Sequence, residues 1–301
     1  MRSEIIVLSG ANHLNIKSTC EFESGLFACG ESSFRLLCSV RYKPVTIIQS
    51  FPNTNNNLME LILAIDSAKR SGASNINVIL MIFPYSRQDK KHKSGVPISA
   101  KIVCDMLREA QADRVITFDL HNEAIEGFMH PSVVFDHIEL TSFLAYNLKE
   151  NINDISDWTF VSPDAGAIKR TKKLMDACGA SKMAVVDKTR TTPGVVDEVN
   201  LIGSVEYQNC IVVDDMVSSG GTLLAVEKEL IHKGALSVTL CCSHGIFTSG
   251  EEMFRESNIF VTNTLPLSGL VDFFDISPLI KKLVISIDSG TDLRSFFRYS
   301  S

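Results

Sequence analysis

Two adjacent carboxylates followed by a run of small residues form the segment of this chain with the clearest chemistry. Residues 213–222 read VDDMVSSGGT and follow a β-branched run typical of a buried strand. Asp214 and Asp215 could accept hydrogen bonds from the vicinal hydroxyls of a sugar. Backbone N–H groups and hydroxyls at the start of the next helix could bind a phosphate, and the residues that would supply them are Ser218, Ser219, Gly220, Gly221 and Thr222. The pattern predicts a ribose-phosphate site, and a plain strand-to-helix turn with an acidic cap is the alternative.

A second strand, small-residue turn and helix occur earlier in the chain. Residues 163–170 read PDAGAIKR directly after the predicted strand Thr159–Ser162. This turn could hold a diphosphate, with Asp164 as a metal ligand and Lys169 or Arg170 supplying positive charge. A plain helix cap remains the alternative for this turn taken alone.

Polar and cationic groups follow three further strands. Asp119 and His121 come after the predicted strand Arg114–Phe118, and this spacing suits a magnesium or phosphate site. A cationic loop spans residues 84–95 and suggests a polyphosphate ligand, with a solvated surface loop as the alternative. Lys188 and Arg190 lie on a third loop, where cations could stabilise charge during phosphoryl transfer.

The elements that must position these loops alternate between β-branched runs and helical periods, which is the pattern of a parallel sheet covered by helices. Leu58, Leu61 and Ile65 share one helical face that ends at Gly72, and a second helix is expected to begin with Ser99 as its N-cap. The predicted strands are Val45–Gln49, Asn77–Phe83, Arg114–Phe118, Thr159–Ser162, Met183–Val186, Cys210–Val213, Val238–Cys241, Ile259–Val261 and Leu283–Ile287. In parallel sheets of this kind ligands bind beyond the carboxyl ends of the strands.

Length and composition set the outer limits. The 301 residues are 45% hydrophobic and 21% charged, which suits two α/β domains of similar size, and the asparagine-rich stretch 151–157 is one candidate boundary. The net charge of −6 argues against nucleic-acid binding through bulk charge. The apolar runs are too short to span a bilayer, and the N-terminus lacks the features of a signal peptide, so we expect a soluble protein.

The eight cysteines include no CxxC pair, and several lie inside apolar runs. We therefore expect buried, reduced thiols in a cytoplasmic protein and no disulfide.

Several long segments in register resemble the ribose-phosphate pyrophosphokinase family. The resemblance is carried by FACGESSF (27–34), IIQSF (47–51), NNNLMELILAIDSAKRSGA (55–73), FPYSRQDKKHKSGVPISAK (83–101), ADRVITFDLH (112–121), VSPDAGAIKR (161–170), VDDMVSSGGT (213–222) and VTNTLPLS (261–268). It covers nearly the whole chain. It implies an α/β fold with two phosphoribosyltransferase-like domains, expected here at residues 1–143 and 144–287, with the tail 288–301 packing on the first.

The resemblance also implies a reaction: transfer of the β,γ-diphosphate of Mg-ATP to the C1 hydroxyl of ribose 5-phosphate, giving PRPP and AMP. It further implies Mg²⁺ as cofactor and a homo-oligomer of dimers assembled into a hexamer, with ATP bound between neighbouring subunits.

Site roles can be carried over by motif. ATP would contact Phe27, Cys29, Glu31, Arg87, Gln88, Asp89 and His92. The diphosphate would be held by Asp164, Ala165, Gly166 and Ala167, and ribose 5-phosphate by Asp214, Asp215 and Ser218–Thr222. The metal would be held by His121, Asp164 and Asp119, with Lys188, Arg190 and His121 as the catalytic residues.

Two departures from the family pattern keep another interpretation open. Ser218 stands where the family usually has a third Asp, and Ala167 stands where a second Gly is usual. A catalytically weak regulatory subunit is therefore one alternative. A phosphoribosyltransferase that consumes PRPP is another, although the cationic loop argues against it.

Overall fold

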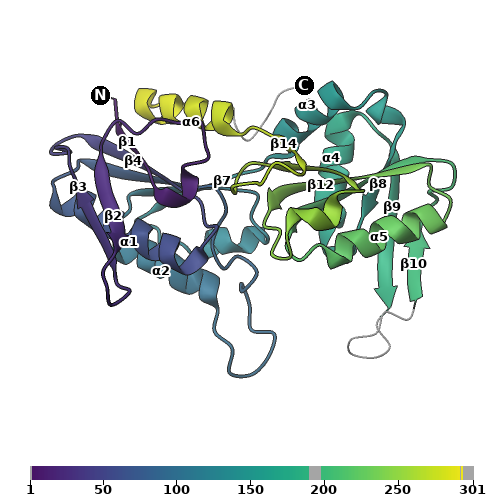
Figure 1. The fold of residues 1–301 in the computed structure, drawn as a ribbon, viewed down its shortest axis with the longest axis horizontal. Coiled ribbons are helices and arrows are strands. Elements are labelled where there is room, and N and C mark those ends of the chain that lie inside the picture. The colour runs from purple at the N-terminus through teal and green to yellow at the C-terminus, as the bar shows by residue number, and fades with distance from the viewer. Residues whose placement is uncertain (1, 190–197, 292, 294–301) are drawn as a thin grey trace. The chain divides into compact units, whose positions relative to one another are not determined.

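The computed structural model describes residues 2–189, 198–291 and 293, and it divides the chain into two compact units (Figure 1). Among the described residues, unit 1 contains those up to Glu139, the short segment Thr264–Pro266 and those from Ile276 to Leu293, while unit 2 contains Leu140–Asn263 and Leu267–Asp275. The division falls four residues before the expected boundary at 143/144, and the stretch 151–157 lies inside unit 2.

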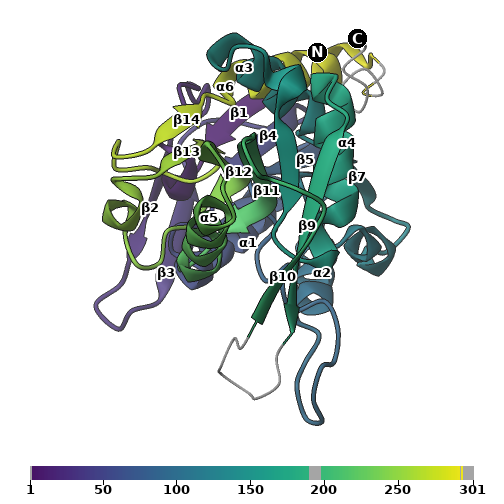
Figure 2. The same cartoon turned by 90° about the vertical axis from the view of Figure 1, so that its right-hand side faces the viewer.

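Unit 1 is built on a parallel sheet of five strands in the order β1-β4-β5-β6-β7. The strands are β1 (Glu4–Val7), β4 (Pro44–Gln49), β5 (Asn75–Leu80), β6 (Arg114–Phe118) and β7 (Val134–Ile138). The β-branched residues of β4 and β5 are fully buried, as expected for a sheet covered on both faces. The helices α1 (Thr54–Arg70) and α2 (Ser99–Glu109) lie on one face, and α6 (Ser277–Ser289) lies on the other (Figures 1 and 2).

Helix α1 forms for the reasons that its sequence indicates. Leu58, Leu61 and Ile65 are buried against the sheet, each contributing about 1.5 to 3 kcal/mol. The helix ends at Arg70, and Gly72 follows with a φ of +84°, the left-handed conformation that glycine adopts readily. The predicted N-cap role of Ser99 is wrong, because Ser99 is the first residue of α2 and its Oγ donates to Gln88 Oε1 at 2.6 Å.

Helix α6 corrects a predicted strand over Leu283–Ile287. The β-branched residues there suggested a strand, but Leu279, Ile280, Leu283 and Val284 are buried at helical spacing. Pro278 near the start and Gly290 at the end delimit the helix. The helix belongs to unit 1 and not to the second domain as its residue numbers suggested, and Ser3 N–H donates to its Asp288 at 3.0 Å.

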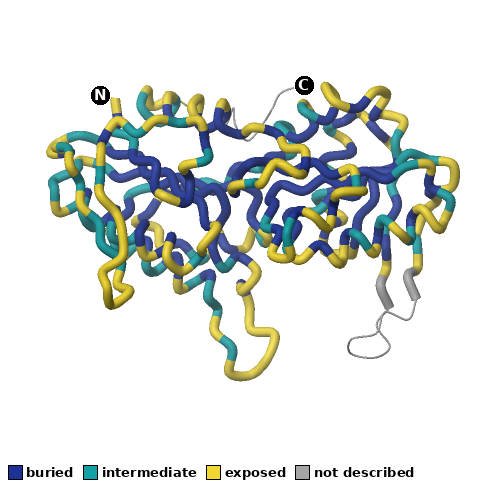
Figure 3. Tube along the Cα trace, viewed as in Figure 1, coloured by how far each residue is buried: buried dark blue, intermediate teal, exposed yellow. Residues whose placement is uncertain are grey.

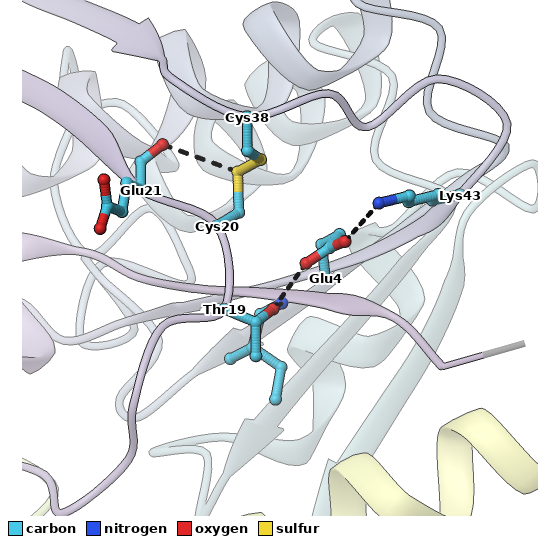
Figure 4. Close-up of polar contacts among 7 residues, drawn as sticks. Glu4, Thr19, Cys20, Glu21, Cys38 and Lys43 are labelled. Carbon is cyan, nitrogen blue, oxygen red and sulfur yellow. Dashed lines mark hydrogen bonds and ion pairs between the residues drawn. A yellow bond between two sulfur atoms is a disulfide. The ribbon is translucent and has the colours of Figure 1, made fainter.

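A separate hairpin in unit 1 overturns the expectation that every cysteine is reduced. The strands β2 (Phe22–Leu26) and β3 (Ser32–Leu36) pair antiparallel, with Phe22 opposite Leu36. Continuing that register outward places Cys20 opposite Cys38, and the two form a disulfide (Figure 4). The prediction failed because it treated each cysteine by its own neighbours and not by strand pairing. The other six cysteines are free, and of these only Cys29 is exposed.

Unit 2 contains a sheet of seven strands in the order β10-β9-β8-β11-β12-β13-β14. The strands are β8 (Thr159–Ser162), β9 (Lys182–Thr189), β10 (Glu198–Ile202), β11 (Asn209–Val217), β12 (Ser237–Gly245), β13 (Asn258–Thr262) and β14 (Asp272–Phe274). All neighbours are parallel except β9 and β10. The helices are α3 (Thr141–Asn151), α4 (Ile168–Cys178) and α5 (Gly221–His232), and the core lies between the sheet and these helices (Figure 3).

No helix in the described part of the chain is long and apolar enough to cross a membrane.

Candidate active site

The sheet of unit 2 reverses its winding direction between β8 and β11. β8 leads through α4 to β9 on one side, whereas β11 leads through α5 to β12 on the other. The two strands are parallel neighbours, with Val161 opposite Val212. Their following loops, which are the two predicted phosphate-binding turns, therefore leave the same edge of the sheet side by side. A crevice at such a switch point is the usual ligand site of open α/β sheets.

The loop of Asp214 and Asp215 begins inside β11, a strand that is longer than predicted. β11 continues to Val217, so Asp214 and Asp215 belong to the strand itself. Asp215 N–H donates to Asp214 Oδ1 at 2.8 Å, and Arg170 lies 3.5 Å from Asp215 Oδ1. The Asp215 side chain is only 6% exposed, so Arg170 provides the countercharge that a buried carboxylate needs.

A cysteine lies beside this pair of carboxylates. Cys242 on β12 is opposite Asp214 and is fully buried. Burial raises the pKa of the Cys242 thiol well above its usual value, and the negative charge of Asp214 raises it further. The thiol therefore stays neutral behind the loop.

The small-residue turn 218–222 requires glycine at position 220 but not at position 221. Gly220 has φ of +84°, and a Cβ there would lie 2.7 Å from the ring of Phe254. At Gly221, the first residue of α5, a Cβ would meet no described atom within 4 Å. Ser219, Gly221 and Thr222 are exposed at the helix N-terminus, which is the geometry of a phosphate site.

The loop after β8 is held by hydrogen bonds to its own aspartate. Asp164 Oδ1 accepts hydrogen bonds from the N–H groups of Gly166 at 2.8 Å and Ala167 at 3.1 Å. Asp164, Ala165 and Gly166 are exposed, whereas Ala167 is buried, and these residues lead directly into α4. Two of the amides predicted to bind a diphosphate are thus engaged by Asp164 in this conformation.

The predicted loop position of Lys188 is wrong, because β9 extends to Thr189 and Lys188 belongs to that strand. The backbone of Lys188 pairs with that of Val199 in the β9–β10 ladder. Arg190 lies outside the described residues.

In unit 1, the loops after β5 and β6 are joined to each other. Asp89 is buried and accepts a hydrogen bond from Asn122, which follows the Asp119–His121 turn. Arg87, Gln88 and His92 are exposed on the long loop before α2 (Figure 3). The structure therefore gathers the predicted ATP loop and the predicted metal turn at the carboxyl edge of one sheet.

The Asp119–His121 turn has an unusual backbone. Asp119 has φ of +34° and is 9% exposed, while His121 is exposed. The N–H groups of Asp119 and Leu120 donate to Ile138 O at 3.1 Å and His137 Nε2 at 3.0 Å. Sequence reasoning missed His137 and Asn122 because their partners come from other loops and strands.

The remaining predicted ATP contacts occupy the tip of the β2–β3 hairpin. Phe27 and Glu31 close the turn by a backbone hydrogen bond of 2.8 Å, and Phe27 is 59% exposed. Cys29 and Glu31 are also exposed.

The described residues contain no group of three or more His, Cys, Asp or Glu side chains arranged to hold a metal. His121 and Asp119 belong to unit 1, and Asp164 belongs to unit 2. Mg²⁺ is commonly bound by one or two carboxylates together with substrate phosphates and water. Asp119 in unit 1 and Asp164 in unit 2 are each a carboxylate of the kind that this mode uses.

Two domain models from known protein families match this chain. The model of the N-terminal domain of ribose phosphate pyrophosphokinase matches residues 9–110, and that of the phosphoribosyl transferase domain matches residues 137–264. The ribose-phosphate pyrophosphokinase of Aquifex aeolicus is 36% identical over 281 residues, which are 90% of this chain and 89% of that protein. The chain belongs to the ribose-phosphate pyrophosphokinase family.

Two further relatives extend the match across the chain. The ribose-phosphate pyrophosphokinase of Clostridium perfringens is 37% identical over 288 residues, covering 92% of this chain and 89% of the relative. The crystal structure of phosphoribosylpyrophosphate synthetase from Mycobacterium smegmatis superimposes with a TM-score of 0.87 at 30% identity, covering 96% of this chain and all of that chain.

These matches confirm the predicted fold class, family and enzyme activity, ribose-phosphate diphosphokinase. They do not support the alternative of a regulatory subunit.

Proposed function

We propose that this enzyme binds ribose 5-phosphate at the switch point of unit 2 and transfers to its C1 hydroxyl the β,γ-diphosphate of Mg-ATP, releasing AMP. The observation that carries this assignment is the position of the Asp214–Thr222 segment between β8 and β12, beside the Asp164 loop. A sugar diol and a phosphate need two different kinds of partner, and this one segment offers both.

The sugar end of the site is the carboxylate pair. Asp214 and Asp215 accept hydrogen bonds from the ribose hydroxyls, and Arg170 lies 3.5 Å from Asp215 as its countercharge. The 5-phosphate binds the turn and the first residues of α5 through Ser218, Ser219, Gly220, Gly221 and Thr222. Because Ser218 is neutral, it adds no charge repulsion near the phosphate.

The diphosphate is assigned to the Asp164 loop. The amides of Gly166 and Ala167 become donors to the diphosphate when Asp164 turns away from its cap. Ala165 extends the exposed face of the loop. The methyl group of Ala167 does not crowd that face, since the residue is only 6% exposed.

ATP is assigned to the exposed loop of unit 1. Arg87, Gln88 and His92 contact the nucleotide, and Ser99 orients Gln88 through its hydrogen bond of 2.6 Å. Asp89 stabilises the conformation of this loop, because it is buried and accepts a hydrogen bond from Asn122.

Magnesium is the proposed cofactor, with Asp119, His121 and Asp164 as its protein ligands. When bound, Mg²⁺ neutralises the charge of the phosphates. Lys188 and Arg190 stabilise charge on the transferring group, and catalysis of this kind depends on positioning and electrostatics.

Assembly and location are also proposed. Phe27, Cys29 and Glu31 frame the adenine of an adjacent subunit within dimers that form a hexamer. The exposure of Leu26 and Phe27 supports a partner at the hairpin, since both side chains are 59% exposed. We also propose a cytoplasmic location.

A product analysis tests this function. Purified enzyme is incubated with ribose 5-phosphate and Mg-ATP, and AMP is separated from ADP. AMP formed in step with PRPP, and only with ribose 5-phosphate present, is the expected result. ADP would mean ordinary phosphoryl transfer and would overturn the proposed reaction.

A further inference from the structure

We propose that His137 is a positioning residue for the Asp119–His121 turn, acting as a neutral imidazole protonated on Nδ1. The effect on rate rests on the proposed function, because it requires that this turn contributes Asp119 and His121 to the site. The tautomer and the contacts do not depend on that function.

The hydrogen bonds of the ring determine its protonation. Leu120 N–H donates to His137 Nε2 at 3.0 Å, and a backbone N–H can bond only to a nitrogen with a free lone pair. Nε2 therefore carries no proton, and Nδ1 carries it. Nδ1 lies 3.0 Å from Glu126 Oε1 and donates to that carboxylate. The ring is held at both nitrogens, and its side chain is only 6% exposed.

The turn that His137 contacts is strained. Asp119 has φ of +34°, a left-handed conformation that is unfavourable for a residue with a Cβ. Such conformations persist where surrounding contacts hold them, and they concentrate at functional sites. Here two consecutive residues of β7 supply those contacts. Asp119 N–H donates to Ile138 O at 3.1 Å, and Leu120 N–H donates to His137 Nε2.

The consequence is a link between β7 and the proposed metal ligands. Leu120 lies between Asp119 and His121. Because its N–H donates to Nε2 of His137, His137 fixes the backbone between these two residues. Glu126, in the short helix Glu123–Phe128 that follows the turn, orients the ring and selects its tautomer. This is the arrangement by which outer groups orient ligands in metal sites.

The tautomer can be tested on the whole enzyme without substrate or metal. Long-range ¹H–¹⁵N spectra of protein labelled at its seven histidines separate the two neutral tautomers. Signals of His137 are assigned by their loss in His137→Gln. We expect an Nδ1-protonated ring at neutral pH, and an Nε2-protonated ring would overturn the proposal.

Kinetics test the positioning role. His137→Gln keeps an acceptor near the place of Nε2, whereas His137→Phe removes it. We expect kcat of His137→Phe to fall about 10- to 100-fold, with the KM for ribose 5-phosphate unchanged and with His137→Gln largely restored. His130→Phe is the matched control. The His130 ring contacts its neighbour Ser132, so we expect this variant to leave kcat unchanged.

Equal losses in His137→Gln and His137→Phe, or normal kcat in His137→Phe, would contradict the positioning role. If His137→Phe does not fold, the tautomer measurement still decides. Failure of the proposed function would show instead as absence of AMP formation by the wild type.

Discussion

The two units use the same strand–helix–strand connection but wind their sheets differently. In unit 1, β4, β5, β6 and β7 follow one another in both sequence and space, so each new strand is added on the same side. In unit 2 the direction reverses between β8 and β11. The reversal places helices α4 and α5 on opposite faces of the sheet, and their N-terminal loops start from the neighbouring strands β8 and β11.

This difference explains how the two units can take different parts of one reaction. At the switch point of unit 2, two carboxylates lie in the same segment as the turn that we propose binds the phosphate of one small ligand. The loops of unit 1 lie on one run of neighbouring strands, and they hold each other through Asp89 and Asn122 while leaving Arg87 and Gln88 exposed. We expect substitutions in unit 2 to affect ribose 5-phosphate and substitutions in unit 1 to affect ATP.

The largest effect is expected at Asp215. Asp215→Ala removes an acceptor for the ribose hydroxyls and the ion pair with Arg170, so kcat/KM for ribose 5-phosphate should fall on the order of 10²-fold or more. The KM for ATP should change little. Steady-state kinetics with each substrate varied measures both, with Asp272→Ala at the exposed sheet edge as the control. An equal change in both KM values would break the division between units.

The disulfide of unit 1 is expected to affect stability next most strongly. It closes a loop of 18 residues, for which the chain-entropy estimate is about 3 kcal/mol. Replacing Cys20 and Cys38 by Ser should lower the unfolding midpoint in urea, and dithiothreitol should do the same to the wild type only. Cys29→Ser is the control, since Cys29 is free. Eight reactive thiols in denatured, unreduced protein would show that the bridge does not form.

Gly220 tests the phosphate turn of unit 2. Gly220→Ala places a Cβ 2.7 Å from Phe254 at positive φ, so we expect a loss of about 1 to 3 kcal/mol of stability and weaker ribose 5-phosphate binding. Gly221→Ala is the stability control, because its Cβ meets no described atom. Urea unfolding of both variants measures the difference, and equal stability would mean that the turn relaxes freely.

Arg87 is the matching test in unit 1. Arg87→Ala removes an exposed cation from the ATP loop, and the KM for ATP should rise about tenfold, the equivalent of about 1.4 kcal/mol. The KM for ribose 5-phosphate and the stability should stay unchanged. Arg108→Ala on α2 serves as the control for loss of charge. A selective rise in the KM for ribose 5-phosphate would reverse the assignment of the two units.

The smallest effect is expected at Glu4, on the first strand of unit 1. Hydrogen bonds from Lys43 and Thr19 lower the pKa of Glu4 below its ordinary 4.5 (Figure 4). The carboxylate therefore adds stability above that pH and loses it as the pH falls through the lowered pKa. Glu4→Gln should cost less than about 1 kcal/mol at pH 7. Urea unfolding should show a larger difference between Glu4→Gln and the wild type at pH 7 than at pH 3.

The residue pattern within a short segment predicted those strands that depend on neighbouring residues in the sequence. The bounds of β6 and β8 were predicted to the residue, because each is a short apolar run between turn residues. The run Leu283–Ile287 was misassigned because β-branched residues outweighed a helical spacing that starts earlier, at Leu279. The Cys20–Cys38 bridge depends on pairing between strands, which residue type alone does not reveal.

The site divides in the same way. The loop of Asp214 and the loop of Asp164 were recognisable as strand, turn and helix, and the strand order then explained why they adjoin. The engagement of the Gly166 and Ala167 amides by Asp164 was not predictable from composition. Nor was His137, whose partner Leu120 is 17 residues away along the chain.

A crystal structure of the enzyme with ribose 5-phosphate would test the proposed site directly. We expect the sugar hydroxyls against Asp214 and Asp215 and the phosphate at the start of α5, between β8 and β12 of unit 2. A sugar phosphate bound instead on the Arg87 loop of unit 1 would contradict it.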